Sequence, residues 1–353
     1  MDSVPEMPRE SERLSWSRRD FVTGLGAFFA SQLLLPSVLG GVELPADLKP
    51  IRLGFLTDCH AMDEHDAPAW LDYTAALMNS LKPDLIIGGG DFVHGGFHST
   101  GKVMEHRWGV VDTFLRKLKT RLEPLIGNHD FYEPLQSDGT PSQGDPRWRW
   151  RKYFGLEHTY RSFRWHGYRF LMLDSVKVVG GQDPYRGWID AAQLAWLDRE
   201  LATIPSNEPI ILCTHIPFHT MVAGSFGPLV GPSPGRVHVL NAKRVMEKLQ
   251  NRPIAAILQG HVHINESLEM NGIPCITGGA VCGKWWQGPN MGTYPGVGVI
   301  EILPNGSQKV EIRRKVAWNY SNTTDPMNGK VKVADDSTIN SCLETNVRSN
   351  GMA

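Results

Sequence analysis

The sequence from Ile51 to His60 reads IRLGFLTDCH. Its apolar run over 51–56 has the length of a buried β-strand, and Asp58 and His60 follow it directly. Residues two apart on an extended segment point to the same side, so these two side chains are expected to act as a pair. By the same rule Cys59 points away from them and is expected to be a packed thiol.

Four further apolar runs end in the same way, each followed by residues that can bind a metal or move a proton. They are 85–87 before Gly90-Asp91, 122–126 before Gly127-Asn128-His129-Asp130, 210–213 before Thr214-His215, and 254–258 before Gly260-His261-Val262-His263. In open α/β sheets, ligands bind beyond the carboxyl ends of the strands. Five segments that lie far apart in the sequence are therefore expected to deliver these side chains to one metal site.

The rest of the pattern predicts a layered α/β domain. Apolar residues at helical spacing predict covering helices over 67–81, 103–119, 190–204 and 240–249. Asn-Gly pairs at 271–272 and 305–306 predict β-hairpins, and a third hairpin is expected around 165–168. Parallel and antiparallel strands should therefore occur together.

Charge and cysteine content exclude several classes of protein. The 353 residues include 36 Lys and Arg against 37 Asp and Glu, a formal net charge of −1, whereas sequence-independent nucleic-acid binding needs a basic surface. The five cysteines are scattered and form no CxxC pair, so neither a disulfide scaffold nor a structural zinc site is expected. Hydrophobic residues make up 41% of the chain, which is enough for a sizeable core.

The N-terminal segment has the layout of an export signal. The sequence SRRDFV at 17–22 begins a stretch that carries no charge from Phe21 to Val42, and it resembles a bacterial twin-arginine signal. The alternatives are an uncleaved membrane anchor, because about 20 uncharged residues can span a bilayer, and an ordinary helix. We expect an export signal or anchor over 1–45, a folded domain over 46–318, and a flexible polar tail over 319–353. The expected location is the periplasm or the extracellular space, reached through the export machinery, with membrane attachment as the alternative.

The five polar segments together resemble the motifs of the calcineurin-like metallophosphoesterases, over about residues 51–315. The resemblance implies a four-layer α-β-β-α sandwich with mixed sheets and a dinuclear metal centre at the sheet edge. The purple acid phosphatase branch is not expected, because its members have a Tyr ligand a few residues after the bridging Asp. Here Asp91 is followed by Phe92, Val93 and His94.

The same resemblance assigns the metal ligands. One metal would be bound by Asp58, His60, Asp91 and His263, and the other by Asp91, Asn128, His215 and His261, so that Asp91 bridges them. This mixture of carboxylate, imidazole and amide ligands suits two divalent or mixed-valence ions of Mn, Fe, Zn or Co better than Mg or Ca. Such a pair can turn a bridging water into a hydroxide nucleophile and clamp the phosphoryl oxygens.

Two further groups of residues are candidates for catalysis and substrate binding. His129 is expected to protonate the leaving oxygen or to stabilise charge on it, with Asp130 orienting its imidazole; a purely structural His129 is the alternative. Trp285 and Trp286 could stack a base or sugar, although adjacent Trp residues often pack one inward and one against a loop. His219 is a further candidate for substrate contact. Three more histidines lie on expected rim loops, where any of them could contact substrate, and none is assigned a role; they are His94, His98 and His238.

The expected function is metal-dependent hydrolysis of a small phosphate ester. A phosphodiesterase is preferred on the analogy of fold, and a phosphomonoesterase is the alternative. A non-catalytic binding module on the same fold is a third interpretation, but all seven ligand positions are filled. A nuclease acting on DNA ends is opposed by the neutral charge and the export signal.

Overall fold

The computed structural model describes residues 43–222, 234–305, 309–318 and 332–335. The predicted export signal lies almost entirely outside these residues. Most of the predicted tail also lies outside them, and the structure describes one strand within it, β14 (Lys332–Asp335). Among the described residues, no helix is both long and apolar enough to cross a lipid bilayer.

The first sheet has six strands in the order β14-β13-β12-β1-β2-β3. Its parallel half consists of β1 (Ile51–Leu56), β2 (Leu85–Gly88) and β3 (Leu122–Pro124). On the other side of β1, β12 (Gly296–Asn305) and β13 (Lys309–Trp318) continue the sheet with antiparallel pairing. Strands β1 and β2 are buried along almost their whole length, as expected where both faces of a sheet are covered.

The second sheet also has six strands, in the order β10-β11-β9-β8-β5-β4. Four neighbours run parallel: β5 (Tyr168–Leu173), β8 (Ile210–Thr214), β9 (Ile254–Gln259) and β11 (Ile273–Thr277). Antiparallel hairpin partners form the two edges, and they are β4 (Arg161–Trp165) and β10 (Glu266–Met270). A separate two-stranded ribbon is formed by β6 (Val176–Val178) and β7 (Tyr185–Gly187).

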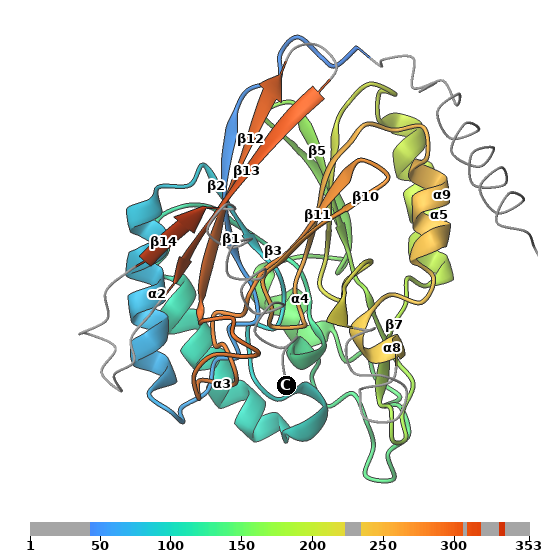
Figure 1. Cartoon of the computed structure of the whole chain (residues 1–353). Helices are drawn as coiled ribbons and strands as arrows, with labels where there is room; N and C mark the ends of the chain where they lie inside the picture. The colour runs from blue at the N-terminus through green and yellow to red at the C-terminus, as the bar shows by residue number, and fades with distance from the viewer. Residues whose placement is uncertain (1–42, 223–233, 306–308, 319–331, 336–353) are drawn as a thin grey trace, which may run out of the picture. The chain divides into compact units, whose positions relative to one another are not determined.

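The two sheets face each other, and helices cover their outer faces (Figure 1). Helices α2 (Ala67–Leu81) and α3 (Gly101–Leu115) lie beside the first sheet, while α5 (Ala191–Thr203) and α9 (Ala242–Leu249) lie beside the second. The predicted four-layer α-β-β-α sandwich with mixed sheets is thereby confirmed. Short helical turns connect the layers: η1 (Gly96–His98), η2 (Asn128–Asp130), α4 (Trp148–Phe154) and α8 (Pro234–Val237).

Apolar side chains fill the space between the sheets and the space beneath the helices. Phe55 on β1 and Phe170 on β5 belong to the inner cluster, and both are buried. Burial of such side chains contributes about 1.5–3 kcal/mol each and fixes the position of the strands. The strand ends that carry the polar segments are therefore held by a rigid core.

The predicted hairpins are present where the structure describes them. Asn271 and Gly272 join β10 to β11 with φ angles of 51° and 77°, the left-handed conformation that a two-residue turn requires. His166 and Gly167 do the same between β4 and β5. Strands β12 and β13 pair antiparallel as predicted, and residues 306–308 of their connection lie outside the described residues.

Candidate metal centre

The predicted ligands leave the strand ends on strained backbone. Five of the seven have left-handed φ angles, and they are Asp58 (55°), His60 (42°), Asp91 (53°), His261 (72°) and His263 (56°). Each such residue costs on the order of 1–3 kcal/mol and persists only where its surroundings hold it. The pairing expected from the sequence assumes that the segment after β1 is extended. These φ angles show that it is not. Its side chains still reach one site, because the backbone N–H groups of Asp58 and His60 donate to the carbonyls of Gly90 and Asp91, each over 2.9 Å.

One group of donor atoms gathers around the imidazole of His60. Its Nε2 lies 3.1 Å from His263 Nε2, 3.5 Å from Asp91 Oδ2 and 3.7 Å from Asp58 Oδ1. His263 Nε2 also lies 3.3 Å from Asp58 Oδ1. All four side chains are buried. The structure thus brings together the four residues predicted for the first metal.

A second group gathers around His215. Its Nε2 lies 3.2 Å from each of three atoms, Asp91 Oδ2, Asn128 Oδ1 and His261 Nδ1. These are the residues predicted for the second metal. Asp91 Oδ2 is the atom that both groups share, which is the position required of a bridging carboxylate oxygen.

Backbone carbonyls fix the orientation of three of the histidines. His215 Nδ1 donates to Gly89 O (2.8 Å), His261 Nε2 to Arg236 O (2.6 Å) and His263 Nδ1 to Gly283 O (2.6 Å). Because a carbonyl can only accept, the outer nitrogen of each ring carries a proton, and the inner nitrogen of the neutral ring directs its lone pair toward the cluster. Metal-binding histidines are oriented in this way. Facing lone pairs only about 3 Å apart repel unless a cation or a proton lies between them, so the donor set fits two metal ions.

The remaining carboxylate, Asp130, has a different role from the one predicted. Its Oδ2 accepts the backbone N–H of Asp91 and of Gly127, each over 2.9 Å, and its Oδ1 accepts those of Phe92 (2.8 Å) and Val93 (3.2 Å). The prediction that Asp130 orients the imidazole of His129 is therefore wrong. Asp130 instead holds the loop that presents the shared carboxylate.

Gly127 has no room for a side chain. A Cβ atom there would lie 2.1 Å from Asp91 Oδ1 and 2.4 Å from the backbone nitrogen of Asp91. Asp91 Oδ1 also accepts the backbone N–H of His129 over 2.7 Å. The segment after β3 thus packs directly on the shared carboxylate and leaves Oδ2 facing the two groups.

Burial and neighbouring charges act in opposite directions on the histidines of the second group. Burial alone would lower the pKa of His215, but the Asp91 carboxylate outweighs it and raises that pKa to about 9. At His261, burial together with the neighbouring His215 lowers the pKa to about 4. A cation that binds the second group must therefore displace the second proton of His215 at neutral pH.

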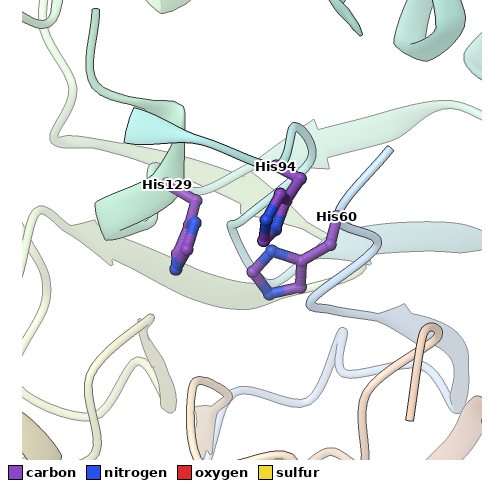
Figure 2. A group of neighbouring side chains, drawn as sticks. All are labelled: His60, His94 and His129. Carbon is purple, nitrogen blue, oxygen red and sulfur yellow. The ribbon is translucent and has the colours of Figure 1, made fainter. Parts of the chain in front are cut away.

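His129 lies beside the first group, and its Nδ1 accepts a hydrogen bond from the protein backbone. The backbone N–H of Gly95 donates to His129 Nδ1 over 3.3 Å, so the ring proton is on Nε2. Its ring centroid lies 4.6 Å from that of His60 and 5.2 Å from that of His94. Figure 2 shows that the three rings come from separate segments and point toward one another. Burial, acting with the neighbouring imidazoles, lowers the pKa of His129 well below its usual value.

His94 is the site residue that sequence reasoning left without a role. Its ring lies 5.5 Å from that of His60 and stacks on His129 with an angle of 22° between the planes. Its position in the sequence could have assigned it to the site, because His94 lies three residues after Asp91 and therefore in the loop that carries the shared carboxylate.

The two predicted tryptophans occupy different environments. The ring of Trp285 is partly exposed and lies 4.4 Å from His60, 5.3 Å from His129 and 4.9 Å from His263. Trp286 is only 9% exposed, and its Nε1 donates to the backbone carbonyl of His60 over 3.0 Å. The indole of Trp286 is packed inward and positions a predicted ligand, which is the alternative given above for adjacent Trp residues. Its contact with substrate stays a prediction.

His219 is not brought into the cluster by any contact that the described residues show. Its carbonyl accepts a hydrogen bond from the Gln259 amide, and burial together with His238 lowers the pKa of its ring. Its role in substrate binding stays a prediction. The thiol of Cys59 is buried, as predicted, and Cys275 and Cys282 are separate buried thiols.

The chain is similar in sequence to known phosphoesterases. A family model described as calcineurin-like phosphoesterase matches residues 51–265. The chain is 28% identical over 207 residues to a cAMP/cGMP dual specificity phosphodiesterase of Mycobacterium tuberculosis, a match that covers 58% of this chain and 56% of that protein. It is 25% identical over 282 residues to a 3′,5′-cyclic adenosine monophosphate phosphodiesterase of Escherichia coli, covering 75% of this chain and 90% of the relative.

Among solved structures, a dimetal phosphatase from Danio rerio resembles this chain. The superposition gives a TM-score of 0.52 at 13% sequence identity and covers 75% of this chain and 99% of the other. At that identity the likeness concerns the fold alone. The chain spans about half the length of the mycobacterial relative.

Replacing the shared carboxylate tests the centre directly. We expect protein equilibrated with Mn²⁺ to hold two ions per chain and the Asp91→Asn variant to lose both, because an amide is a poor bridging ligand. Metal content measured by inductively coupled plasma mass spectrometry reports the change. Asp72→Asn, which alters an exposed carboxylate on α2, is the control and should retain both ions. Full metal content in Asp91→Asn would contradict the assignment.

The raised pKa of His215 predicts how metal affinity depends on pH. A group whose pKa is raised keeps its proton below about pH 9, so the cation must displace that proton and its affinity rises as the pH increases from 6.5 toward 9. For one displaced proton the rise is about tenfold per pH unit. Chelator competition with Mn²⁺ measures this slope. His106→Gln, at an exposed position on α3, should leave the slope unchanged, whereas a pH-independent affinity in the unmodified protein would refute the argument.

Proposed function

The chain belongs to the calcineurin-like phosphoesterase family, and we propose that it hydrolyses phosphate diesters at the centre formed by the two donor groups. The observation that carries this proposal is the position of Asp91 Oδ2, which lies 3.5 Å from His60 Nε2 in one group and 3.2 Å from His215 Nε2 in the other. One carboxylate oxygen can therefore bridge two ions. The names of the mycobacterial and E. coli relatives, both phosphodiesterases, support the choice of a diester.

The residues present fit two divalent or mixed-valence ions of Mn, Fe, Zn or Co. Asp58, His60 and His263 would hold one ion, Asn128, His215 and His261 the other, and Asp91 both. Two ions held in this way would activate water and neutralise charge on the phosphoryl group. Only two of the seven donors, Asp58 and Asp91, are charged when ionised, so the occupied centre keeps a net positive charge that attracts a phosphate anion.

His129 supplies the hydrogen-bond donor of the site. Since its Nδ1 accepts from the Gly95 N–H, its Nε2–H is free to donate to an ester oxygen on which negative charge develops. A donor aimed at developing charge is worth most in a partly buried site such as this one. Asp130 acts through the backbone that it holds, and is a positioning residue.

A single assay tests the proposed activity. Protein loaded separately with Mn²⁺, Fe²⁺, Zn²⁺ or Co²⁺ is given bis-p-nitrophenyl phosphate, p-nitrophenyl phosphate and 3′,5′-cyclic AMP. We expect at least one metal to support turnover of the diesters with a kcat/KM at least about tenfold above that of the monoester, and Asp91→Asn to be inactive. A preference for the monoester would make the protein a phosphatase, and inactivity with all four metals would favour a binding module.

The role of His129 has its own test. His129→Ala should lower kcat by about 10²- to 10⁴-fold, the usual contribution of a positioned donor or acid, while the metal content stays at the unmodified level. His158→Ala, which removes an exposed imidazole, is the control and should leave kcat unchanged. If His129→Ala lost metal together with activity, its side chain would be a structural support of the centre instead.

A further inference from the structure

A cavity of about 430 Å³ adjoins the three-histidine group of Figure 2. Its wall is formed by loop residues after β1 and β2, one residue of α3 and the turn after β11; they are Met62, Glu64, His65, His94, Arg107, Trp285 and Gln287. Cavities of this size can hold a small organic group. None of these residues is among the seven predicted metal ligands.

The cavity shares a wall with the proposed centre. The rings of His94 and Trp285 lie 5.1 Å apart, and each also contacts the rings of His60 and His129. A phosphate ester bound at the two donor groups would therefore have one of its organic substituents next to this opening.

Trp285 is held in this wall by a strained turn. It and Trp286 have φ angles of 52° and 65°, which are unfavourable for aromatic residues. The turn is fixed by hydrogen bonds from Lys284 N to Gly288 O and from Trp286 N to Cys282 O, each 2.8 Å. Strain of this kind is concentrated at functional sites, where the surrounding structure maintains it. The indole face of Trp285 is thereby kept beside the cavity.

The charge of the cavity is balanced. Arg107 donates through Nη1 to the carbonyl of His94 (2.9 Å) and to Ser99 Oγ (3.1 Å), and through Nη2 to Glu64 Oε1 (3.3 Å). The guanidinium of Arg107 is thus paired with the Glu64 carboxylate and hydrogen-bonded to other residues around the cavity. An anionic ligand group would find no unpaired positive charge on Arg107 and would be repelled by Glu64. An uncharged ring would instead be stabilised by stacking on the indole of Trp285.

From these contacts we propose that the cavity binds an uncharged, flat ring carried by the alcohol that is esterified to the phosphate, a nucleobase or a similar heteroaromatic ring, stacked on Trp285. This inference rests on the proposed function, because the phosphate itself is placed at the metal centre. It names a class of substrate, a nucleoside phosphodiester without a second charged group near the base.

The test compares two ligands that bind through the same phosphonate group. Isothermal titration of Mn²⁺-loaded protein with methylphosphonate and with the non-hydrolysable phosphonate analogue of AMP gives two dissociation constants. We expect the AMP analogue to bind at least about fivefold more tightly, since base stacking on an aromatic side chain contributes at least that factor. In Trp285→Ala this advantage should disappear, with methylphosphonate affinity and metal content unchanged, and Trp285→Phe should retain part of it.

Trp148→Ala, at a partly exposed tryptophan of α4 outside this cavity, is the matched control and should keep the full advantage. The inference is overturned if the unmodified protein binds both ligands equally, if Trp285→Ala keeps the advantage, or if that variant loses affinity for both ligands to the same extent. If the unmodified protein binds neither ligand, the proposed function fails first and the inference fails with it.

Discussion

The carboxylate of Asp91 is the contact on which the rest of the centre depends. Its Oδ2 belongs to both donor groups, and its Oδ1 accepts the backbone N–H of His129. The loop that presents it donates three backbone N–H groups to Asp130, and Gly127 in the next segment donates a fourth. That segment approaches so closely that only glycine fits at position 127. Each of these features leaves Oδ2 as the free acceptor. Because the carboxylate is buried, leaving it ionised without partners would cost much free energy of folding.

Strain and metal binding are connected in this site. Five of the seven predicted ligands have left-handed backbone, and each costs on the order of 1–3 kcal/mol. Hydrogen bonds between neighbouring loops offset part of this cost, as when Asp58 and His60 donate to the loop after β2. A ligand that binds only the folded arrangement adds its binding free energy to stability. The metal ions we propose would therefore stabilise the loops as well as take part in catalysis.

The sequence predicted the strands and the residues of the centre better than it predicted the backbone between them. The apolar run over 51–56 and the helical pattern over 67–81 coincide with β1 and α2, because burial periodicity is a local property. The pairing of Asp58 with His60 was correct for a reason other than the one assumed, since the segment turns and does not extend. The hydrogen bonds of Asp130 and the inward packing of Trp286 depend on loops distant in sequence, which no local pattern encodes. His94 was recognised only as a rim-loop histidine without an assigned role for the same reason: its neighbours His60, His129 and Trp285 come from three other segments.

The division of the site into a charged centre and a neutral cavity follows from where its parts lie in the fold. The donor groups stand at strand ends fixed by the core, which suits the tight geometry that metal ions require. The cavity is built mainly from loops, where selection for different substrates can change side chains without disturbing the sheets. The two parts are nevertheless joined, because Trp286 donates to the carbonyl of His60 while the adjacent Trp285 forms the cavity wall. A substitution that moves the backbone of this turn would therefore also displace His60, a predicted metal ligand, so changes of substrate at this wall are limited to those that leave the turn in place.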